Sequence, residues 1–169
     1  MTDSSPRTVT LARKSVLLTG ATRGIGRATA IRLAREKVRL ALCGRDAAAL
    51  ARVAGEVRSL SGEEVFARAF DLADAAAVQE FYEGAKAALG APDILVNNAG
   101  YNERKAPILD ATTEEFDRMV AVNLRAPFIL AREAARDMVA RKSGHIVNVL
   151  STVCHFANET MGIYTATKR

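Results

Sequence analysis

A tyrosine and a lysine near the end of the 169-residue chain have side chains and a spacing that suit acid–base chemistry. Tyr164 and Lys168 stand four residues apart, so on a helix they share one face, about 6 Å apart along its axis. A neighbouring ammonium favours a phenolate and lowers a phenol's pKa from about 10 toward neutrality. Such a phenol can serve as the acid in carbonyl reduction or as the base in alcohol oxidation. By itself, the pair is equally compatible with a plain surface contact.

Two further polar residues could complete this site. Ser151 follows the apolar run 145–150, and a hydroxyl there can donate to a substrate oxygen as charge develops, although a turn role or use of the neighbouring Thr152 is the alternative. Asn123 lies four residues before Pro127, which has no N–H, so the helical bond to the Asn123 carbonyl cannot form. We therefore expect a free carbonyl and a helix bend at Asn123, unless the proline serves packing alone.

A glycine cluster suggests a binding site for a pyrophosphate. Gly20 permits a tight turn after an apolar run, Gly24 lets the backbone approach an anion, and Gly26 allows close packing of helix on strand. The free N–H groups of the helix that begins there attract the anion. The spacing G-x-x-x-G-x-G differs from the commoner G-x-G-x-x-G, and three glycines alone could form a simple turn. The strand-to-helix setting favours a dinucleotide site.

Basic residues indicate which dinucleotide would bind. A site for NAD(H) usually places an acidic residue after the second strand to bind the ribose 2′-hydroxyl, whereas a 2′-phosphate requires a cation. Here Arg45 follows Gly44, and Arg23 lies in the glycine cluster, so both guanidinium groups favour NADP(H). NAD(H) stays the alternative because Asp46 could face a 2′-hydroxyl, although it could also cap a helix. Either arginine could instead be a solvated surface charge.

The elements that must position these residues alternate along the chain. Short β-branched runs predict strands at 15–19, 39–43, 65–70, 94–97 and 145–150. Helical periodicity between them begins after Asp46, after Asp74, and at Thr112 with Glu115 as a capping box. This alternation predicts an α/β fold, a doubly wound Rossmann-type parallel sheet with strand order 3-2-1-4-5. We expect one domain over 14–169, incomplete at its C-terminus, after a polar tail over 1–13.

Composition argues against several other classes of protein. The net charge of +5 is scattered and lacks aromatic interleaving, which argues against a nucleic-acid groove, though it would suit an anionic cofactor or an acyl-carrier substrate. Cys43 and Cys154 are far apart with no ligand spacing, so neither a disulfide framework nor a metal site is expected. No apolar segment is long enough for a membrane span or a signal peptide, and we expect a cytoplasmic protein.

These motifs together resemble the short-chain dehydrogenase/reductase family. The family's variant of the glycine motif, T-G-x-x-x-G-I-G, matches residues 19–26, and its N-N-A-G motif matches residues 97–100. Ser151 lies 13 residues before Tyr164, similar to the family's separation. The resemblance implies hydride transfer between a nicotinamide and a carbonyl or secondary alcohol, with Ser151, Tyr164, Lys168 and Asn123 as catalytic residues. It implies cofactor binding by Gly20, Thr22, Arg23, Gly24, Ile25, Gly26, Arg45, Asp71, Leu72, Asn98, Ala99, Gly100, Tyr164 and Lys168.

The resemblance also carries more detailed expectations. Asp71 and Leu72 resemble the family's adenine-contacting pair, although a turn-capping aspartate is an alternative, and the residue matching Asn123 holds a water that relays protons to the lysine. The segments 102–118 and 151–164 look most similar to 3-oxoacyl-acyl-carrier-protein reductases, which implies a small-molecule or acyl-carrier-linked carbonyl substrate. Family members form dimers and tetramers and continue well past the lysine. We therefore expect exposed apolar surface on the fifth strand, and the alternative function is an inactive dinucleotide-binding fragment.

Overall fold

Five short strands form one parallel sheet in the computed structural model, which describes residues 10–102, 107–156 and 159–169. The strands are β1 (Ser15–Thr19), β2 (Arg39–Gly44), β3 (Val65–Ala69), β4 (Ile94–Asn97) and β5 (His145–Asn148). Their order is β3-β2-β1-β4-β5, and every neighbouring pair is parallel. The predicted doubly wound α/β fold and strand order are confirmed. β3 and β5 end one and two residues earlier than predicted, and residues 1–9 of the expected tail lie outside the described part.

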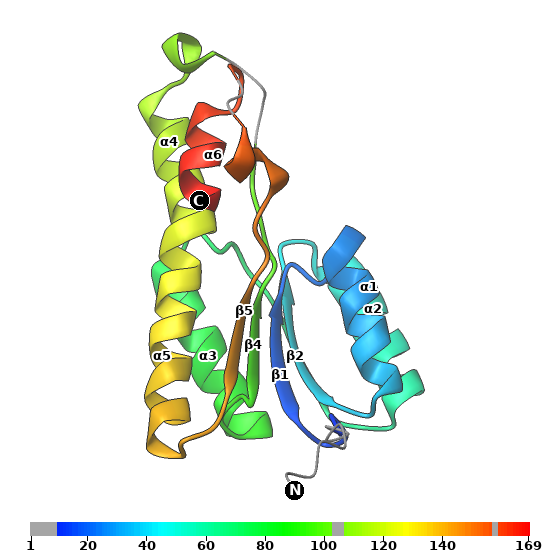
Figure 1. Ribbon diagram of the computed structural model, residues 1–169. Coiled ribbons are helices and arrows are strands. Elements are labelled where there is room, and N and C mark those ends of the chain that lie inside the picture. The colour runs from blue at the N-terminus through cyan, green and yellow to red at the C-terminus, as the bar shows by residue number, and fades with distance from the viewer. Residues whose placement is uncertain (1–9, 103–106, 157–158) are drawn as a thin grey trace, which may run out of the picture.

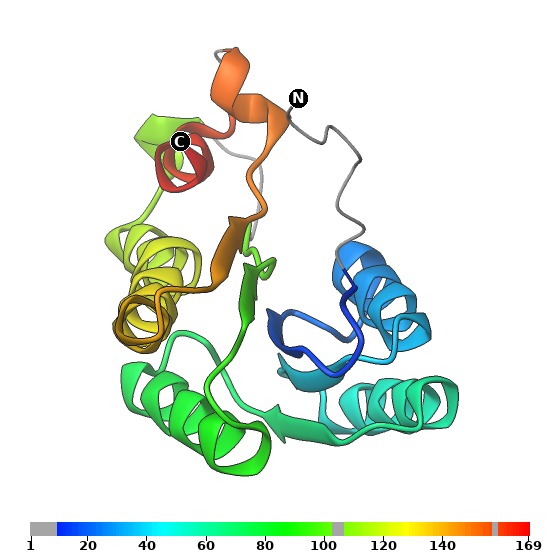
Figure 2. The ribbon, with the colours of Figure 1, turned by 60° about the horizontal axis from the view of Figure 1, so that its bottom comes forward.

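Helices cover both faces of this sheet (Figures 1 and 2). α1 (Gly24–Arg35) and α2 (Ala47–Ser61) pack on one face, whereas α3 (Ala75–Leu89) and α5 (Ala126–Ala140) pack on the other. α4 (Thr113–Val120) leads into α5 through the π-helical turn η2 (Ala121–Arg125), and α6 (Gly162–Lys168) contacts both α4 and η2. The predicted caps are confirmed: Asp46 and Asp74 accept bonds from the first turns of α2 and α3, and Thr112 and Glu115 form a capping box.

The sheet separates two apolar cores because successive side chains of a strand point to opposite faces. On β1, Leu17 packs with Phe81 of α3 and Leu130 of α5. Its neighbours Val16 and Leu18 pack instead with the helices α1 and α2. All three β1 residues are at most 1% exposed, so this strand is the rigid centre from which the glycine turn emerges.

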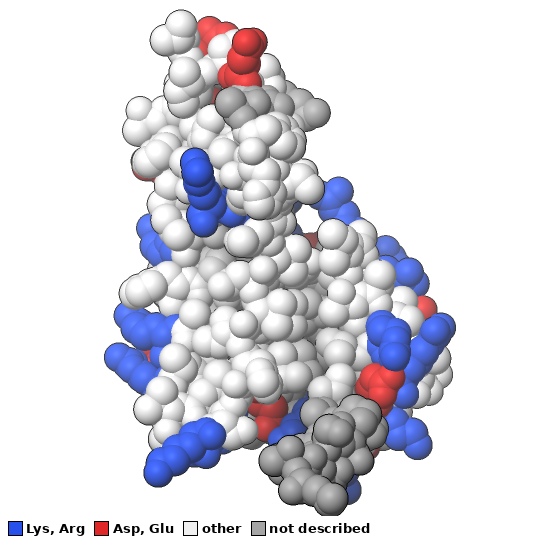
Figure 3. Space-filling model, viewed as in Figure 1, with Lys and Arg blue, Asp and Glu red and all other residues white. Residues whose placement is uncertain are grey.

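β5 is the edge strand and is exposed, as expected for the fifth strand. Ile146 and Val147 are 38% and 46% exposed. Figure 3 shows uncharged surface over the middle of this face, with lysine and arginine side chains placed mainly around its margin. Within the described ranges, no helix combines the length and apolar character needed to cross a bilayer.

The strand order reverses between β1 and β4, and this reversal decides where a ligand can bind. In open parallel sheets, the helices that follow two such strands leave on opposite faces and create a crevice at the carboxyl ends of the strands. Here α1 follows β1 on one face, and α5 precedes β5 on the other (Figure 2). The segments that emerge into this crevice are the glycine turn after β1 and the Asn98 to Gly100 segment after β4.

Candidate active site

A pocket of about 550 Å³ lies at the carboxyl ends of β1, β2 and β4. Its volume falls within the range of about 300–1,000 Å³ that is usual for small-molecule sites. Every residue predicted to bind the cofactor lies on its wall, from five separate parts of the chain: Gly20, Thr22, Arg23, Gly24, Ile25, Gly26, Arg45, Asp71, Leu72, Asn98, Ala99, Gly100, Tyr164 and Lys168. The structure therefore brings the predicted set together, and their roles in binding stay predictions.

The glycine turn needs glycine at each of its three positions for a different reason. Gly20 and Gly24 have φ angles of +70° and +54°, which L side chains rarely adopt. A Cβ on Gly26 would lie 2.1 Å from the carbonyl oxygen of Gly20, so only glycine lets α1 pack this close. A Cβ on Gly24 would meet nothing within 4 Å and would stand in open space. The turn is therefore shaped to leave room beside Gly24 at the start of α1.

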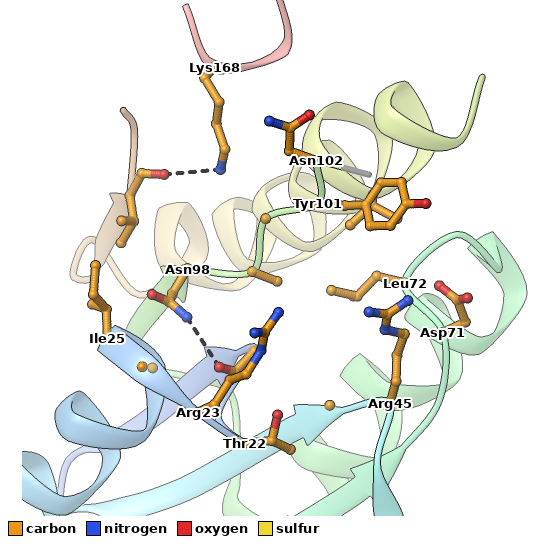
Figure 4. Close-up of a pocket in the computed structure, with 18 of the residues that line it drawn as sticks. Thr22, Arg23, Ile25, Arg45, Asp71, Leu72, Asn98, Tyr101, Asn102 and Lys168 are labelled. Carbon is orange, nitrogen blue, oxygen red and sulfur yellow. Dashed lines mark hydrogen bonds between the residues drawn. The ribbon is translucent and has the colours of Figure 1, made fainter. Parts of the chain in front are cut away.

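The segment after β4 holds this turn in place. The Asn98 side-chain amide donates to the carbonyl oxygens of Thr19 and Gly20, at 2.9 and 3.3 Å. The Thr19 hydroxyl in turn accepts from the backbone N–H groups of Asn98 and Ala99, at 3.1 and 3.0 Å. Asn98 therefore ties the ends of β1 and β4 to each other, and Figure 4 shows its amide directed at the glycine turn.

Charged residues gather at the end of the pocket near β2. Arg45 lines the wall and is exposed, and it makes no hydrogen bond or ion pair with any described residue. Asp71 accepts from the backbone N–H of Ala73 at 2.9 Å and pairs with Arg118 at 2.7 Å. Burial alone would raise the pKa of Asp71, but the Ala73 N–H and the Arg118 guanidinium together hold it below its usual range. The carboxylate is therefore charged and fixed in place.

Asp46 acts as the cap of α2. Its carboxylate accepts from the backbone N–H of Ala49 at 2.9 Å. It does not line the pocket described above, whereas the preceding Arg45 does. Of the two roles that the sequence left open for Asp46, the capping bond is present.

Tyr164 and Lys168 line the opposite end of the pocket from Arg45. Lys168 is 6% exposed, and its Nζ donates to the carbonyl oxygen of Val149 at 3.2 Å (Figure 4). Burial disfavours the ammonium and lowers the pKa of Lys168. A Cβ on Gly100 would lie 3.2 Å from Nζ, so a glycine there keeps the lysine's approach to the pocket open.

Ser151 lies beside the pocket and does not appear on its wall, although the two residues before it, Val149 and Leu150, do. It is the N-cap of η3 (Thr152–His155), where its hydroxyl accepts from the backbone N–H of Val153 at 3.4 Å. This is the turn role that the sequence offered as an alternative. The bond is long and uses an acceptor lone pair, so the hydroxyl hydrogen can still donate elsewhere.

Asn123 is 6% exposed and lies behind the pocket wall in η2. The helix responds to Pro127 by widening into a π turn, in which the Ala126 N–H bonds to Ala121 five residues back. We expected a bend, and the π turn is the form that the distortion takes. The Asn123 side chain accepts from the Tyr101 N–H at 2.7 Å and donates to the Tyr101 carbonyl at 2.8 Å and to Thr167 at 3.0 Å.

Sequence reasoning missed several residues of the wall. They include Gly44, where a Cβ would lie 2.5 Å from the Thr22 methyl group, and Tyr101 directly after the N-N-A-G motif. The position of Tyr101 next to a recognised motif was the available signal. Arg118 could not be found in this way, because its contact with Asp71 joins residues 47 positions apart. Among the described residues, no group of three His, Cys, Asp or Glu side chains could hold a metal ion.

Comparisons with known proteins agree with this geometry. The family model described as short chain dehydrogenase matches residues 14–169. The short chain dehydrogenase/reductase dpmpG of Macrophomina phaseolina is 34% identical over 153 residues, which cover 89% of this chain and 87% of that protein. A metagenomic short-chain oxidoreductase solved in complex with NADP is 38% identical with a TM-score of 0.88, covering 95% of this chain and 71% of that one.

A second solved structure, NAD⁺-bound xylitol dehydrogenase, is 32% identical with a TM-score of 0.86. The match covers 94% of this chain and 60% of that one. Several other curated relatives are likewise matched over only 57 to 64% of their length. The glycine turn, the parallel sheet and the match of the family model over most of the sequence together show that the chain belongs to the short-chain dehydrogenase/reductase family.

Proposed function

We propose that this chain carries the cofactor site and catalytic residues of an NADP(H)-dependent oxidoreductase that interconverts carbonyls and secondary alcohols. The observation that carries the proposal is that one pocket has the glycine turn at its centre, two arginines toward one side, and Tyr164 and Lys168 at the far end. A pyrophosphate at the glycine turn would leave one nucleoside toward the arginines and the other toward Tyr164. Family membership supports the reaction class.

The residues present fit a dinucleotide. The room beside Gly24 lies at the first turn of α1, whose N-cap Arg23 makes no side-chain capping bond, so that backbone N–H groups there are available to phosphate oxygens. The helix dipole adds a positive field at the same point. When bound, a nicotinamide dinucleotide supplies hydride for carbonyl reduction or accepts it in alcohol oxidation.

The chain's own residues would handle the proton and the substrate oxygen. Tyr164 would pass a proton to the carbonyl oxygen when the carbonyl carbon is reduced, which would form the alcohol. Lys168, once protonated, stabilises the resulting phenolate, and burial strengthens this interaction because the surroundings have a low dielectric constant. Ser151 donates a hydrogen bond to the same substrate oxygen. Asn123 fixes the segment after β4 to α6 and so positions the helix that carries Tyr164 and Lys168.

Arg45 and Arg23 support NADP(H) over NAD(H). Both line the pocket, and Arg45 has no ion-pair partner among the described residues, so its guanidinium is available to a 2′-phosphate. Asp46, the residue that could have favoured NAD(H), is bonded to the N-terminus of α2. Calorimetric titration with NADPH and NADH tests the preference. We expect tighter binding of NADPH and a loss of at least about tenfold for NADPH alone in Arg45→Ala; tighter binding of NADH by the unchanged protein would reverse the assignment.

Turnover tests the reaction itself. We expect NADPH oxidation, followed at 340 nm, with at least one member of a panel of ketones and 3-oxoacyl thioesters, since these are the carbonyl substrates that the resemblance implies. Tyr164→Phe keeps the ring and removes the proton donor, so it should lower kcat by about 100-fold or more while NADPH still binds. Binding of NADPH without turnover on any carbonyl would favour the alternative, an inactive dinucleotide-binding fragment.

Two further properties belong to the same proposal. Leu124, Phe128 and Val139 are 54 to 75% exposed on η2 and α5, and a second copy of the chain would cover them in a homodimer or homotetramer. Light scattering of the unchanged protein and of Phe128→Glu tests this, and a monomeric mass for the unchanged protein as well as for the variant would contradict it.

Cys43 and Cys154 are both free thiols, which is typical of the reducing cytoplasm.

A further inference from the structure

Tyr101 presents an aromatic ring at the end of the pocket near β2. It directly follows Gly100 and lines the wall together with Arg45, Asp71 and Leu72 (Figure 4). The guanidinium carbon of Arg45 lies 5.8 Å from the centre of the ring, and that of Arg118 lies 5.0 Å from it. Both distances are within the range of cation–π attraction, about 6 Å. An aromatic ring and two guanidinium groups thus lie side by side at this end of the pocket.

The backbone that carries the Tyr101 ring is held firmly, whereas the Arg45 side chain is not. The buried Asn123 side chain binds both the N–H and the carbonyl of Tyr101, at 2.7 and 2.8 Å. Arg118 is fixed by its ion pair with Asp71 at 2.7 Å. Arg45, by contrast, is exposed and bonded to no described side chain. The Arg45 guanidinium can therefore move while the segment that carries the Tyr101 ring stays in place.

We propose that Tyr101 is the platform on which the adenine ring of the dinucleotide stacks, with the Arg45 guanidinium on the opposite face of the base. This rests on the proposed function, which puts the phosphates at the glycine turn and the nicotinamide near Tyr164. The adenine then lies at the remaining end, to which Tyr101 and Phe70 contribute aromatic side chains, whereas Tyr164 lines the nicotinamide end. The Asp71 carboxylate at this end can accept a further hydrogen bond from an exocyclic amine.

The present spacing is close to what such a stack requires. Stacked layers lie about 3.5 Å apart, so a base between a guanidinium and a phenol needs about 7 Å. The Arg45 carbon is now 5.8 Å from the ring centre, and a shift of about 1 Å by an exposed side chain would open the gap. Base–aromatic stacking is worth about 5- to 150-fold in affinity.

Adenosine 2′,5′-bisphosphate tests the stack, because it contains the base and lacks the nicotinamide. The chain has three tyrosines and no tryptophan, so tyrosine emission can report on Tyr101. We expect the ligand to quench emission of the unchanged protein. By calorimetry, the Kd of Tyr101→Phe for this ligand should be within about twofold of that of the unchanged protein, because phenylalanine keeps the stack. The variant should nevertheless lose most of the quenching, because the substitution removes the fluorophore. Tyr82→Phe, which removes a buried core tyrosine, should keep the quenching.

Tyr101→Ala should bind adenosine 2′,5′-bisphosphate about 5- to 150-fold more weakly. Equal affinity in Tyr101→Ala, or quenching that persists in Tyr101→Phe, would overturn the platform and leave the proposed function intact. Failure of the unchanged protein to bind either NADPH or NADH would overturn both. Circular dichroism of each variant separates loss of the stack from loss of the fold, and the Phe variant decides the matter if the Ala variant unfolds.

Discussion

Gly24 offers a way to separate the cost of backbone strain from loss of the phosphate site. Gly24 and Gly62 both have positive φ angles, +54° and +69°, and a Cβ at either position would meet nothing within 4 Å. Gly24 starts α1 on the pocket wall, whereas Gly62 caps the C-terminus of α2 and does not line the pocket. Alanine at either position therefore imposes the same kind of strain, and only at Gly24 does it add an atom to the proposed phosphate site.

The two substitutions should have similar effects on stability and different effects on binding. The left-handed conformation costs an L residue about 1–2 kcal/mol, which for a chain of this length lowers Tm by about 2–8 °C. We expect this loss in Gly24→Ala and Gly62→Ala alike. The methyl group at Gly24 keeps phosphate oxygens from the N–H groups of α1, so the Kd for NADPH should rise more than tenfold in Gly24→Ala alone.

Differential scanning fluorimetry without ligand and calorimetry with NADPH measure the two quantities separately. Gly26→Ala extends the series, since its Cβ would lie 2.1 Å from the Gly20 carbonyl oxygen and should lower both stability and binding. NADPH binding by Gly24→Ala with the affinity of the unchanged protein would refute the placement of the phosphates. Equal loss of binding in Gly62→Ala would show that strain alone explains the effect.

Three further outcomes follow from contacts elsewhere in the chain. Lys168→Met should lower turnover by about 100-fold or more without lowering Tm at pH 7, because it removes a buried ammonium whose charged form is disfavoured; a large fall in Tm would contradict this account. Tyr82→Phe removes the 2.7 Å bond to Asp137 and should cost about 1 kcal/mol, or about 2–4 °C in Tm, with NADPH affinity unchanged. Burial alone would raise the pKa of Asp93, but the Ser15 N–H and the Lys14 ammonium hold it below the usual 3.8. The Lys86 ammonium and the Tyr82 hydroxyl hold the pKa of Asp137 below the same value. Their stabilisation is complete above the unfolded-state value and is lost as pH falls through the lower folded-state values. The stability difference between the unchanged protein and Asp93→Asn or Asp137→Asn should therefore be largest near neutral pH and shrink steadily as pH falls below the unfolded-state value.

Local sequence was sufficient for most of the fold. Each strand is a short apolar run, and the helix starts at Asp46, Asp74 and Thr112 use capping bonds between residues two or three positions apart. Such signals need no tertiary information, because donor and acceptor are near neighbours in the chain. The strand order and the glycine turn followed from motifs that occur in a fixed order. The exact ends of β3 and β5 could not be predicted from these motifs, since pairing with the neighbouring strand decides where a strand ends.

The cofactor wall could be predicted because its members belong to recognisable motifs at strand ends, where a doubly wound sheet gathers them. The side-chain contacts that orient this wall could not be predicted from the sequence. Asn123 reached the prediction through its carbonyl and Pro127, yet its side chain is what joins Tyr101 to Thr167, 22 and 44 residues away. The ion pair of Arg118 with Asp71 likewise joins residues that are far apart in the sequence.

Ser151 and Tyr101 mark the boundary between the two sources of information. From sequence, Ser151 was a hydroxyl at a strand end, and only the structure shows it engaged as the cap of η3 beside the wall. Tyr101 carried no local signal beyond its neighbours, and its closeness to Arg45 and Arg118 depends on three segments that meet in space. The sequence determined the elements and the chemical groups they carry, because hydrophobic periodicity, capping and glycine geometry are local. Tertiary structure decided which groups meet, because side-chain contacts between distant segments depend on packing that no local pattern encodes.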